Sequence, residues 1–152
     1  KHCPHSEYKE GANVWEEQGE IAIPCARENE MDVSDLKILH KNGVFAIVEG
    51  ANMPLTSDAQ KFAREMGLLH APGKAANAGG VTVSGLEMSQ NSMRTTWTFD
   101  KVDNKLKDIM QNIHDLCYES SDQINGVTSY PRGANIASFK KLADTLVALG
   151  MK

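Results

Sequence analysis

The sequence predicts an α/β fold in which a parallel sheet of three strands with crossover helices is followed by C-terminal helices. Between residues 20 and 76, short apolar runs alternate with helical segments, and this β-α-β-α-β order is typical of parallel strands joined by right-handed crossovers. Beyond Pro72 the apolar residues recur at helical spacing instead. With 152 residues, the chain is long enough to bury one core of its own.

Residues 1–19 precede this pattern and are predicted to form a connector with little regular structure. They are polar and interrupted by proline and glycine, and Trp15 is their one large apolar anchor. The apolar run at 21–25 predicts the first buried strand. Cys25 in that run is expected to be an inert core thiol rather than a nucleophile, because free cysteine is among the most buried residue types.

The first helix and the second strand follow from capping signals and composition. Asp32 is a typical N-cap residue, and Asn42-Gly43 forms a stop signal after the apolar positions of the helix. Residues 44–48 are rich in β-branched side chains, include an aromatic one and carry no charge, which predicts a strand covered on both faces.

The second helix and the third strand repeat this pattern. Thr56 or Ser57 is expected to cap the helix, and Gly67 is expected to end it. The apolar residues 68–71 then predict the third strand of the sheet.

The C-terminal half is predicted to be helical. One helix runs from Gly79 toward Met93, a polar loop occupies residues 119–133, and a last helix begins near Asn135. Between them, a further helix has an apolar stripe at the spacing of a core-facing surface. The stripe consists of Val102, Leu106, Ile109, Met110, Ile113 and Cys117. Four methionines are interpreted as gap-fillers of a helical core: Met88, Met93, Met110 and Met151.

Charge and composition argue against several classes of partner. The net charge of −4 predicts no nucleic-acid binding, and the longest apolar run is far shorter than the roughly 20 residues that cross a bilayer. Three widely spaced cysteines favour a reducing compartment such as the cytoplasm. Because the chain opens on Lys1 without a methionine, we expect a processed or excised piece.

Small residues follow all three predicted strands, at the edge of a parallel sheet where ligands bind. The segments are 24–26, 49–52 and 71–73, and Asn52 adds an amide that can both donate and accept hydrogen bonds. Residues 77–80 then open a helix whose free amides can bind an anion. The alternative is that these segments are ordinary strand–helix turns.

Other chemistries lack the residues that they need. No G-x-G-x-x-G follows a strand, so only one half of a doubly wound nucleotide-binding fold is present. A triad based on Ser84 has no evident partners, and His70 and His114 are interpreted as structural, His114 as a packed side chain. No metal site is expected, because the potential ligands His2, Cys3 and His5 lack a fourth.

Three segments resemble the glutamate dehydrogenases of the hexameric class. They are PCARENE at 24–30, EGANMP at 49–54 and KAANAGGVTVSGLEMSQN at 74–91, and Trp97 and RGANIA at 132–137 fit in the same order. The resemblance covers about residues 14–152.

This resemblance implies an oxidoreductase that interconverts L-glutamate with 2-oxoglutarate and ammonium, using NADP or NAD, in a cytoplasmic homo-hexamer. It implies that residues 1–19 are a connector and that residues 20–76 are the second half of a dinucleotide-binding, Rossmann-like domain. Residues 77–152 would be a C-terminal helical segment closing toward a substrate domain that this chain lacks. The alternative is a catalytically silent nucleotide-binding or subunit-docking fragment, with the strand at 44–48 left as a free edge.

The resemblance also assigns roles to individual residues. Cofactor binding falls to Ala26, Asn52 and Asn77, and substrate binding to Val81 and Ser84. The catalytic lysine and aspartate of the family lie upstream of the residues present here, so this chain has no catalytic residue and is expected to be inactive in isolation. Three residues depart from the family pattern: Arg27, Glu28 and Leu55.

Overall fold

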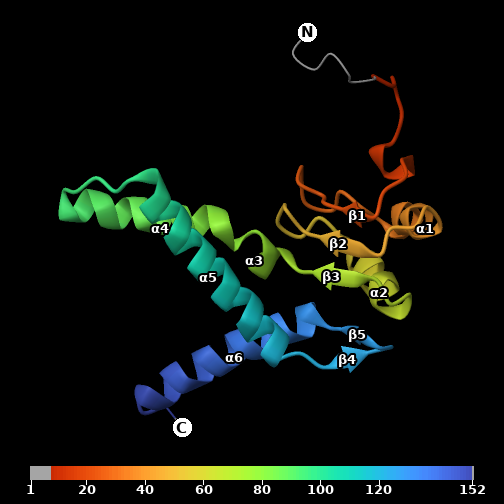
Figure 1. Cartoon of the computed structure of the whole chain (residues 1–152). Helices are drawn as coiled ribbons and strands as arrows, with labels where there is room; N and C mark the ends of the chain where they lie inside the picture. Colours follow the sequence, from red (N-terminus) through yellow and green to blue (C-terminus); the bar gives the residue numbers. More distant parts are fainter. Residues whose placement is uncertain (1–7, 152) are drawn as a thin grey trace.

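The computed structural model describes residues 8–151 and confirms the α/β fold. Within these residues, β1 (Ile21–Ala22), β2 (Ala46–Val48) and β3 (Leu69–Ala71) form a parallel sheet in the order β1-β2-β3 (Figure 1). A short 3-10 helix, η1 (Val14–Glu16), precedes the sheet. Trp15 in this helix packs against the core, as its role of apolar anchor predicts.

Two helices form the core with the sheet. The crossover helices α1 (Val33–Lys41) and α2 (Ser57–Glu65) begin at the predicted caps, since the side chains of Asp32 and Thr56 accept backbone N–H groups of the first turns. Their apolar faces meet the sheet in one cluster. The buried residues of that cluster are Ala22, Met31, Leu36, Leu39, Val44, Ile47, Leu55, Ala59, Ala63 and Leu68.

The first strand is shorter and more exposed than the sequence suggested. Only two residues pair with β2, and beyond them the side chains alternate, with Pro24 buried and Ile23 54% exposed. The expectation that Cys25 lies in the core is wrong, because its side chain is exposed. The physical reason is that alternate side chains of an extended segment point to opposite faces, and Ile21, Ile23 and Cys25 point to a face that is not covered by α1 and α2.

The second strand is paired on both sides but is less completely covered than the sequence predicts. The free edge that the fragment alternative implied at residues 44–48 does not occur, because β2 lies in the centre of the sheet and pairs with both neighbours. Its coverage is incomplete, because Phe45 is 55% exposed. Helix α5 (Phe99–Glu119) lies opposite β2 and β3, and an apolar cavity of about 320 Å³ lies between the helix and these strands.

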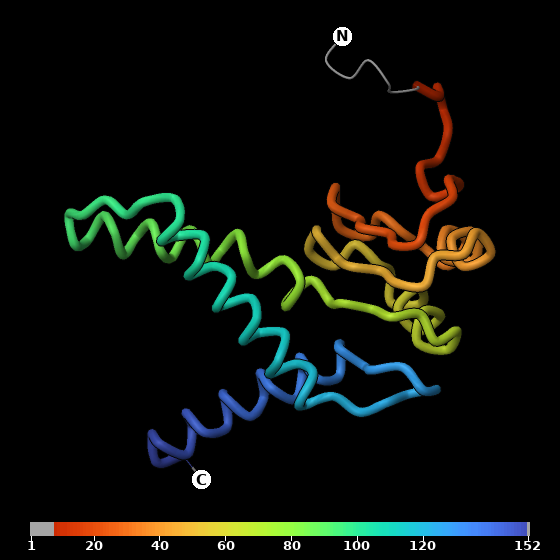
Figure 2. Tube along the Cα trace, viewed as in Figure 1, coloured from red at the N-terminus to blue at the C-terminus, as the bar shows by residue number. Residues whose placement is uncertain are grey.

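The C-terminal half extends away from the sheet. After the single turn α3 (Gly73–Ala76), α4 (Ala78–Met93) projects outward and α5 returns toward the sheet (Figures 1 and 2). α6 (Tyr130–Ala148) then crosses against α5 and ends away from the sheet. No helix of residues 8–151 is both long and apolar enough to cross a membrane.

The predicted loop at 119–133 is wrong in part. It contains a hairpin of β4 (Gln123–Ile124) and β5 (Val127–Thr128), and α6 begins at Tyr130 rather than near Asn135. Asn125 and Gly126 both have positive φ at the turn. An Asn-Gly pair between two short strands is a strong hairpin signal, so this feature was readable from the sequence.

The methionines are also mostly misassigned. Met88, Met93 and Met151 are 70%, 53% and 60% exposed, because α4 and the end of α6 project beyond the core; Met110 on α5 is partly buried.

The apolar stripe of α5 faces its neighbours as predicted, with Cys117 buried at its end. Burial raises the pKa of the Cys117 thiol.

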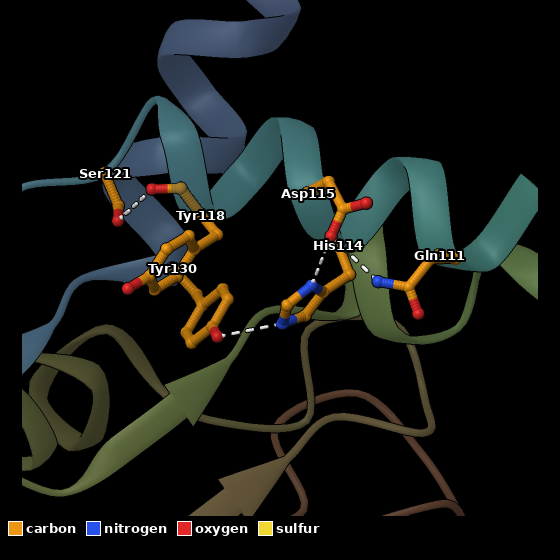
Figure 3. A network of polar contacts seen from close by, with 6 residues as sticks. All are labelled: Gln111, His114, Asp115, Tyr118, Ser121 and Tyr130. Carbon is orange, nitrogen blue, oxygen red and sulfur yellow. Dashed lines mark hydrogen bonds and ion pairs between the residues drawn. The ribbon is translucent and has the colours of Figure 1, made fainter.

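A polar network joins α5 to the start of α6 (Figure 3). His114 Nε2 lies 3.0 Å from the Tyr130 hydroxyl and Nδ1 lies 3.1 Å from Asp115, which also accepts from Gln111. The hydrogen bond from His114, with that from Gln111, lowers the pKa of Asp115. The expectation that His114 is packed is wrong, because its side chain is 52% exposed. It bridges two helix surfaces instead of filling a core position.

Asp32 provides a pH-dependent contribution to the stability of α1. The Ser34 hydroxyl donates to its carboxylate and, together with the N–H groups of Asp35 and Ser34, holds the pKa of Asp32 below the ordinary value of 3.8. A lowered folded-state pKa means that the stabilisation is complete above the unfolded-state value and is lost as the pH falls through the folded-state value.

We expect Ser34→Ala to raise the pKa of Asp32 in an NMR titration and to move this acid-induced loss of stability to higher pH. The reason is that the largest of the three hydrogen-bond contributions has been removed. Ser57→Ala, at the start of α2, is the matched control and should leave the titration of Asp32 unchanged. An Asp32 titration that is identical in Ser34→Ala and the parent would contradict this account.

Candidate functional site

The carboxyl ends of β1 and β2 and the start of α4 meet at one open cavity of about 640 Å³. Ala26 follows β1, Asn52 follows β2, Asn77 stands between α3 and α4, and Val81 lies in the first turns of α4. Four of the five residues assigned by the family resemblance therefore line one surface. The fifth, Ser84, does not line this cavity.

Ser84 lies farther along α4, where its hydroxyl donates to the Gly80 carbonyl oxygen at 3.2 Å and its side chain is exposed. Val81 is also 73% exposed. The first turns of α4 thus form a wall of the cavity at Val81, and the side chains of Val81 and Ser84 are exposed.

Backbone hydrogen bonds hold the two strand ends together. The Pro24 carbonyl oxygen accepts from the N–H groups of Gly50 and Ala51 at 3.0 and 2.9 Å, which ties the end of β1 to the end of β2. Pro24 is itself fully buried. The floor of the cavity is therefore backbone, with the Cys25 Sγ packed against Gly50.

The loops beyond the strand ends are joined in the same way. The N–H of Asn29 donates to the Met53 carbonyl oxygen and that of Met31 donates to Pro54, both at 2.9 Å. Asn29 and Met53 both adopt positive φ. Glu30 closes the first loop, because its carboxylate accepts the N–H of Ala26 at 2.9 Å. Buried anchors thus fix the loops that carry the candidate residues.

The two asparagines contact each other directly. Asn77 Nδ2 donates to Asn52 Oδ1 at 2.7 Å. This bond leaves the Asn77 carbonyl oxygen as an acceptor and the Asn52 amino group as a donor for a ligand. A carboxamide needs one acceptor and one donor, so this pair is suited to hold the carboxamide of a nicotinamide ring.

Six further residues line the cavity, and two of them are charged. Arg27 and Glu28 place opposite charges on its rim, and the exposed Cys25 lies beside them. The other three are Gly50, Ala51 and Met53.

A buried hydrogen-bonded pair, Glu49 and His70, lies next to the site. His70 Nε2 donates to Glu49 Oε1 at 2.8 Å, and the Gly73 N–H donates to Glu49 Oε2 at 2.7 Å. Glu49 and His70 are 4% and 7% exposed. His70 is structural, as predicted, but its partner was missed. The available signal was a glutamate directly after an apolar strand, which must find partners if it is buried.

No group of three or more metal-binding side chains occurs among residues 8–151. The potential ligands His2, Cys3 and His5 lie outside the described residues.

The fold and the cavity define a class of protein. A parallel α/β sheet with a cavity at the carboxyl ends of its strands is the architecture of α/β proteins that bind ligands at that edge, nucleotides among them. A family model described as Glutamate/Leucine/Phenylalanine/Valine dehydrogenase matches residues 1–150. The chain belongs to that family.

The relatives are glutamate dehydrogenases. The NADP-specific enzyme of Salmonella typhimurium is 51% identical over 144 residues, which are 95% of this chain and 32% of that protein. The NAD-specific enzyme of Porphyromonas gingivalis is 45% identical over 151 residues, or 99% of this chain and 34% of that protein. The chain therefore spans about a third of the length of the curated relatives that it matches.

Solved structures agree with this assignment. The structure of Plasmodium falciparum glutamate dehydrogenase 2 matches with a TM-score of 0.86 and 43% sequence identity. The match covers 95% of this chain and 32% of that one.

Proposed function

We propose that this chain forms the nicotinamide side of a glutamate dehydrogenase, which interconverts L-glutamate with 2-oxoglutarate and ammonium using NADP or NAD. In this proposal residues 20–76 are the second half of the dinucleotide-binding domain, residues 1–19 are a connector, and residues 77–152 lead back toward the substrate domain. The observation that carries it is the convergence of Ala26, Asn52 and Asn77 on one cavity. The whole protein would work as a cytoplasmic homo-hexamer.

The residues present fit a nicotinamide nucleotide. The paired amides of Asn52 and Asn77 match a carboxamide, and the backbone floor at Gly50 and Ala51 accepts a planar ring. The nucleotide, when bound, supplies or accepts the hydride. This chain binds and orients the ring, while Val81 and Ser84 on α4 face the amino acid.

Because this chain holds only the nicotinamide side of the site, we expect hydride transfer to need the substrate domain as well. Hydride transfer requires substrate and nicotinamide to be held together, and orientation of that kind contributes roughly 7–11 kcal/mol of the barrier. The cavity described here is open and carries no lysine among its lining residues. We therefore expect the isolated chain to give no NADPH or NADH oxidation with 2-oxoglutarate and ammonium.

A chimaera tests the proposal. Residues 8–151 replace the matching third of the Salmonella NADP-specific relative, and oxidation of NADPH and NADH is measured with 2-oxoglutarate and ammonium. We expect turnover by the chimaera and none by the isolated chain. Asn77→Ala in the chimaera should raise the KM for the nucleotide by roughly tenfold to a hundredfold, because the paired amide is lost.

The matched control is a second chimaera that carries the same region of the Porphyromonas NAD-specific relative, which shows whether the graft itself is tolerated. An inactive but folded chimaera, beside an active control, would favour the silent-fragment alternative. Turnover by the isolated chain would overturn the proposed division between this chain and an upstream segment.

A further inference from the structure

We propose that Glu49 and His70 are positioning residues for the nicotinamide-binding amides, acting through Gly73. This inference rests on the proposed function for its ligand, but its structural part concerns only the geometry of Asn52 and Asn77. Neither Glu49 nor His70 is among the residues that line the cavity beside those amides.

The buried carboxylate joins three segments of the chain. Glu49 directly follows β2, His70 lies within β3, and Gly73 is the first residue of α3. One carboxylate oxygen accepts from His70 at 2.8 Å and the other accepts from the Gly73 N–H at 2.7 Å. Both oxygens are therefore used, and the hydrogen bonds are short enough to fix the start of α3 relative to the sheet.

Gly73 connects Glu49 to Asn77 through backbone hydrogen bonds. Its carbonyl oxygen accepts the Asn77 N–H at 3.0 Å, so Gly73 is hydrogen-bonded to Glu49 on one side and to Asn77 on the other. A Cβ on Gly73 would lie 2.9 Å from the Ala51 carbonyl oxygen and 3.3 Å from Asn77 Nδ2. The single turn of α3 is thus packed against the segment that carries Asn52.

Burial explains why the carboxylate controls the geometry. A buried polar group is stable only where hydrogen bonds replace its water, so displacement of α3 would leave the Glu49 oxygen that now accepts from Gly73 without a partner. The described structure leaves no buried side-chain polar atom of residues 8–151 without a hydrogen bond. A movement of α3 that carries Asn77 away from Asn52 would therefore break a buried hydrogen bond of Glu49.

The test compares Glu49→Met with Glu49→Gln in the full 152-residue chain. Methionine keeps the length of the side chain but accepts neither hydrogen bond, whereas glutamine keeps one acceptor for Gly73 and a polar group for His70. Ile47→Val, in the same strand, is the matched control for loss of packing alone. The readouts are the NMR signals of the Asn52 and Asn77 side-chain amides without nucleotide, and the affinities for NADPH and NADH by titration.

We expect Glu49→Met to shift the Asn77 amide signals and to weaken nucleotide binding by roughly tenfold to a hundredfold. Glu49→Gln should restore both readouts most of the way, and Ile47→Val should leave both near those of the parent. If Glu49→Met does not fold, His70→Leu against His70→Gln makes the same comparison, because only glutamine can still donate to Glu49.

The outcomes separate this inference from the function on which it rests. Unchanged Asn52 and Asn77 amide signals in a folded Glu49→Met chain would overturn the positioning role, whatever the nucleotide affinity. Amide signals that move in Glu49→Met would support the positioning of the amides even in a chain that binds neither NADPH nor NADH, whereas a folded but inactive chimaera would refute the proposed function.

Discussion

Gly133→Ala is expected to destabilise the contact between α5 and α6 by roughly 3 kcal/mol, at the upper end of the cost of overpacking. Gly133 is buried in α6, where that helix packs against Cys117 near the end of α5. A Cβ at this position would lie 1.9 Å from the Cys117 carbonyl oxygen, which is backbone and cannot rotate away. The two helices would have to separate, and with them the hairpin and the start of α6 that lie beside the sheet.

The measurement is urea unfolding followed by far-UV circular dichroism, together with amide hydrogen exchange in α5 and α6. The matched control is Gly85→Ala in α4, where nothing lies within 4 Å of the added Cβ. That change should stabilise the chain by about 0.5–1 kcal/mol, since alanine is a better helix former than glycine. Equal effects of the two substitutions would mean that the helices do not approach as closely as described.

Leu36→Ala is expected to lower the free energy of unfolding by about 2–5 kcal/mol. Leu36 on α1 is fully buried and belongs to the core that α1 and α2 form with the sheet. Truncation removes its transfer free energy and leaves a cavity among neighbours that cannot all collapse inward. Because the same core anchors the loops after β1 and β2, nucleotide binding should weaken as the core loosens.

Urea unfolding of the parent and the variant at the same pH measures this effect. Lys37→Ala is the matched control, since Lys37 is the next residue of α1 and is exposed. A surface change of this kind should alter the free energy of unfolding by no more than about 0.5 kcal/mol. A loss below about 1 kcal/mol for Leu36→Ala would show that α1 is not packed as the structure has it.

Elements whose ends are marked by local chemistry were predicted well. Asp32 and Thr56 cap α1 and α2 because their side chains accept hydrogen bonds from residues only two or three positions away. α1 ends at the predicted Asn42-Gly43 signal, and Gly43 has positive φ. Such interactions involve neighbours in sequence, so the residue types alone are sufficient to indicate them.

The candidate site was predicted by position and resemblance, and the structure added its supports. Ala26, Asn52, Asn77 and Val81 line one cavity because parallel strands end at the same edge of the sheet. The hydrogen bond between Glu49 and His70 joins residues 21 positions apart, and no local sequence pattern indicates which residue pairs with a buried carboxylate. The exposure of Cys25 follows from the face of the sheet to which it points, and that depends on where the helices pack.

The sequence by itself determined the parallel α/β class, the capped helices and the segments that meet at the strand ends, because periodicity and capping act over a few residues. Only the tertiary structure decided that β2 is central, that three methionines are exposed and that α5 and α6 meet at Gly133. These features depend on which surfaces come together across long stretches of chain. Burial is a property of the neighbours a residue acquires, and an apolar side chain is equally apolar in the core and on a helix that projects from it.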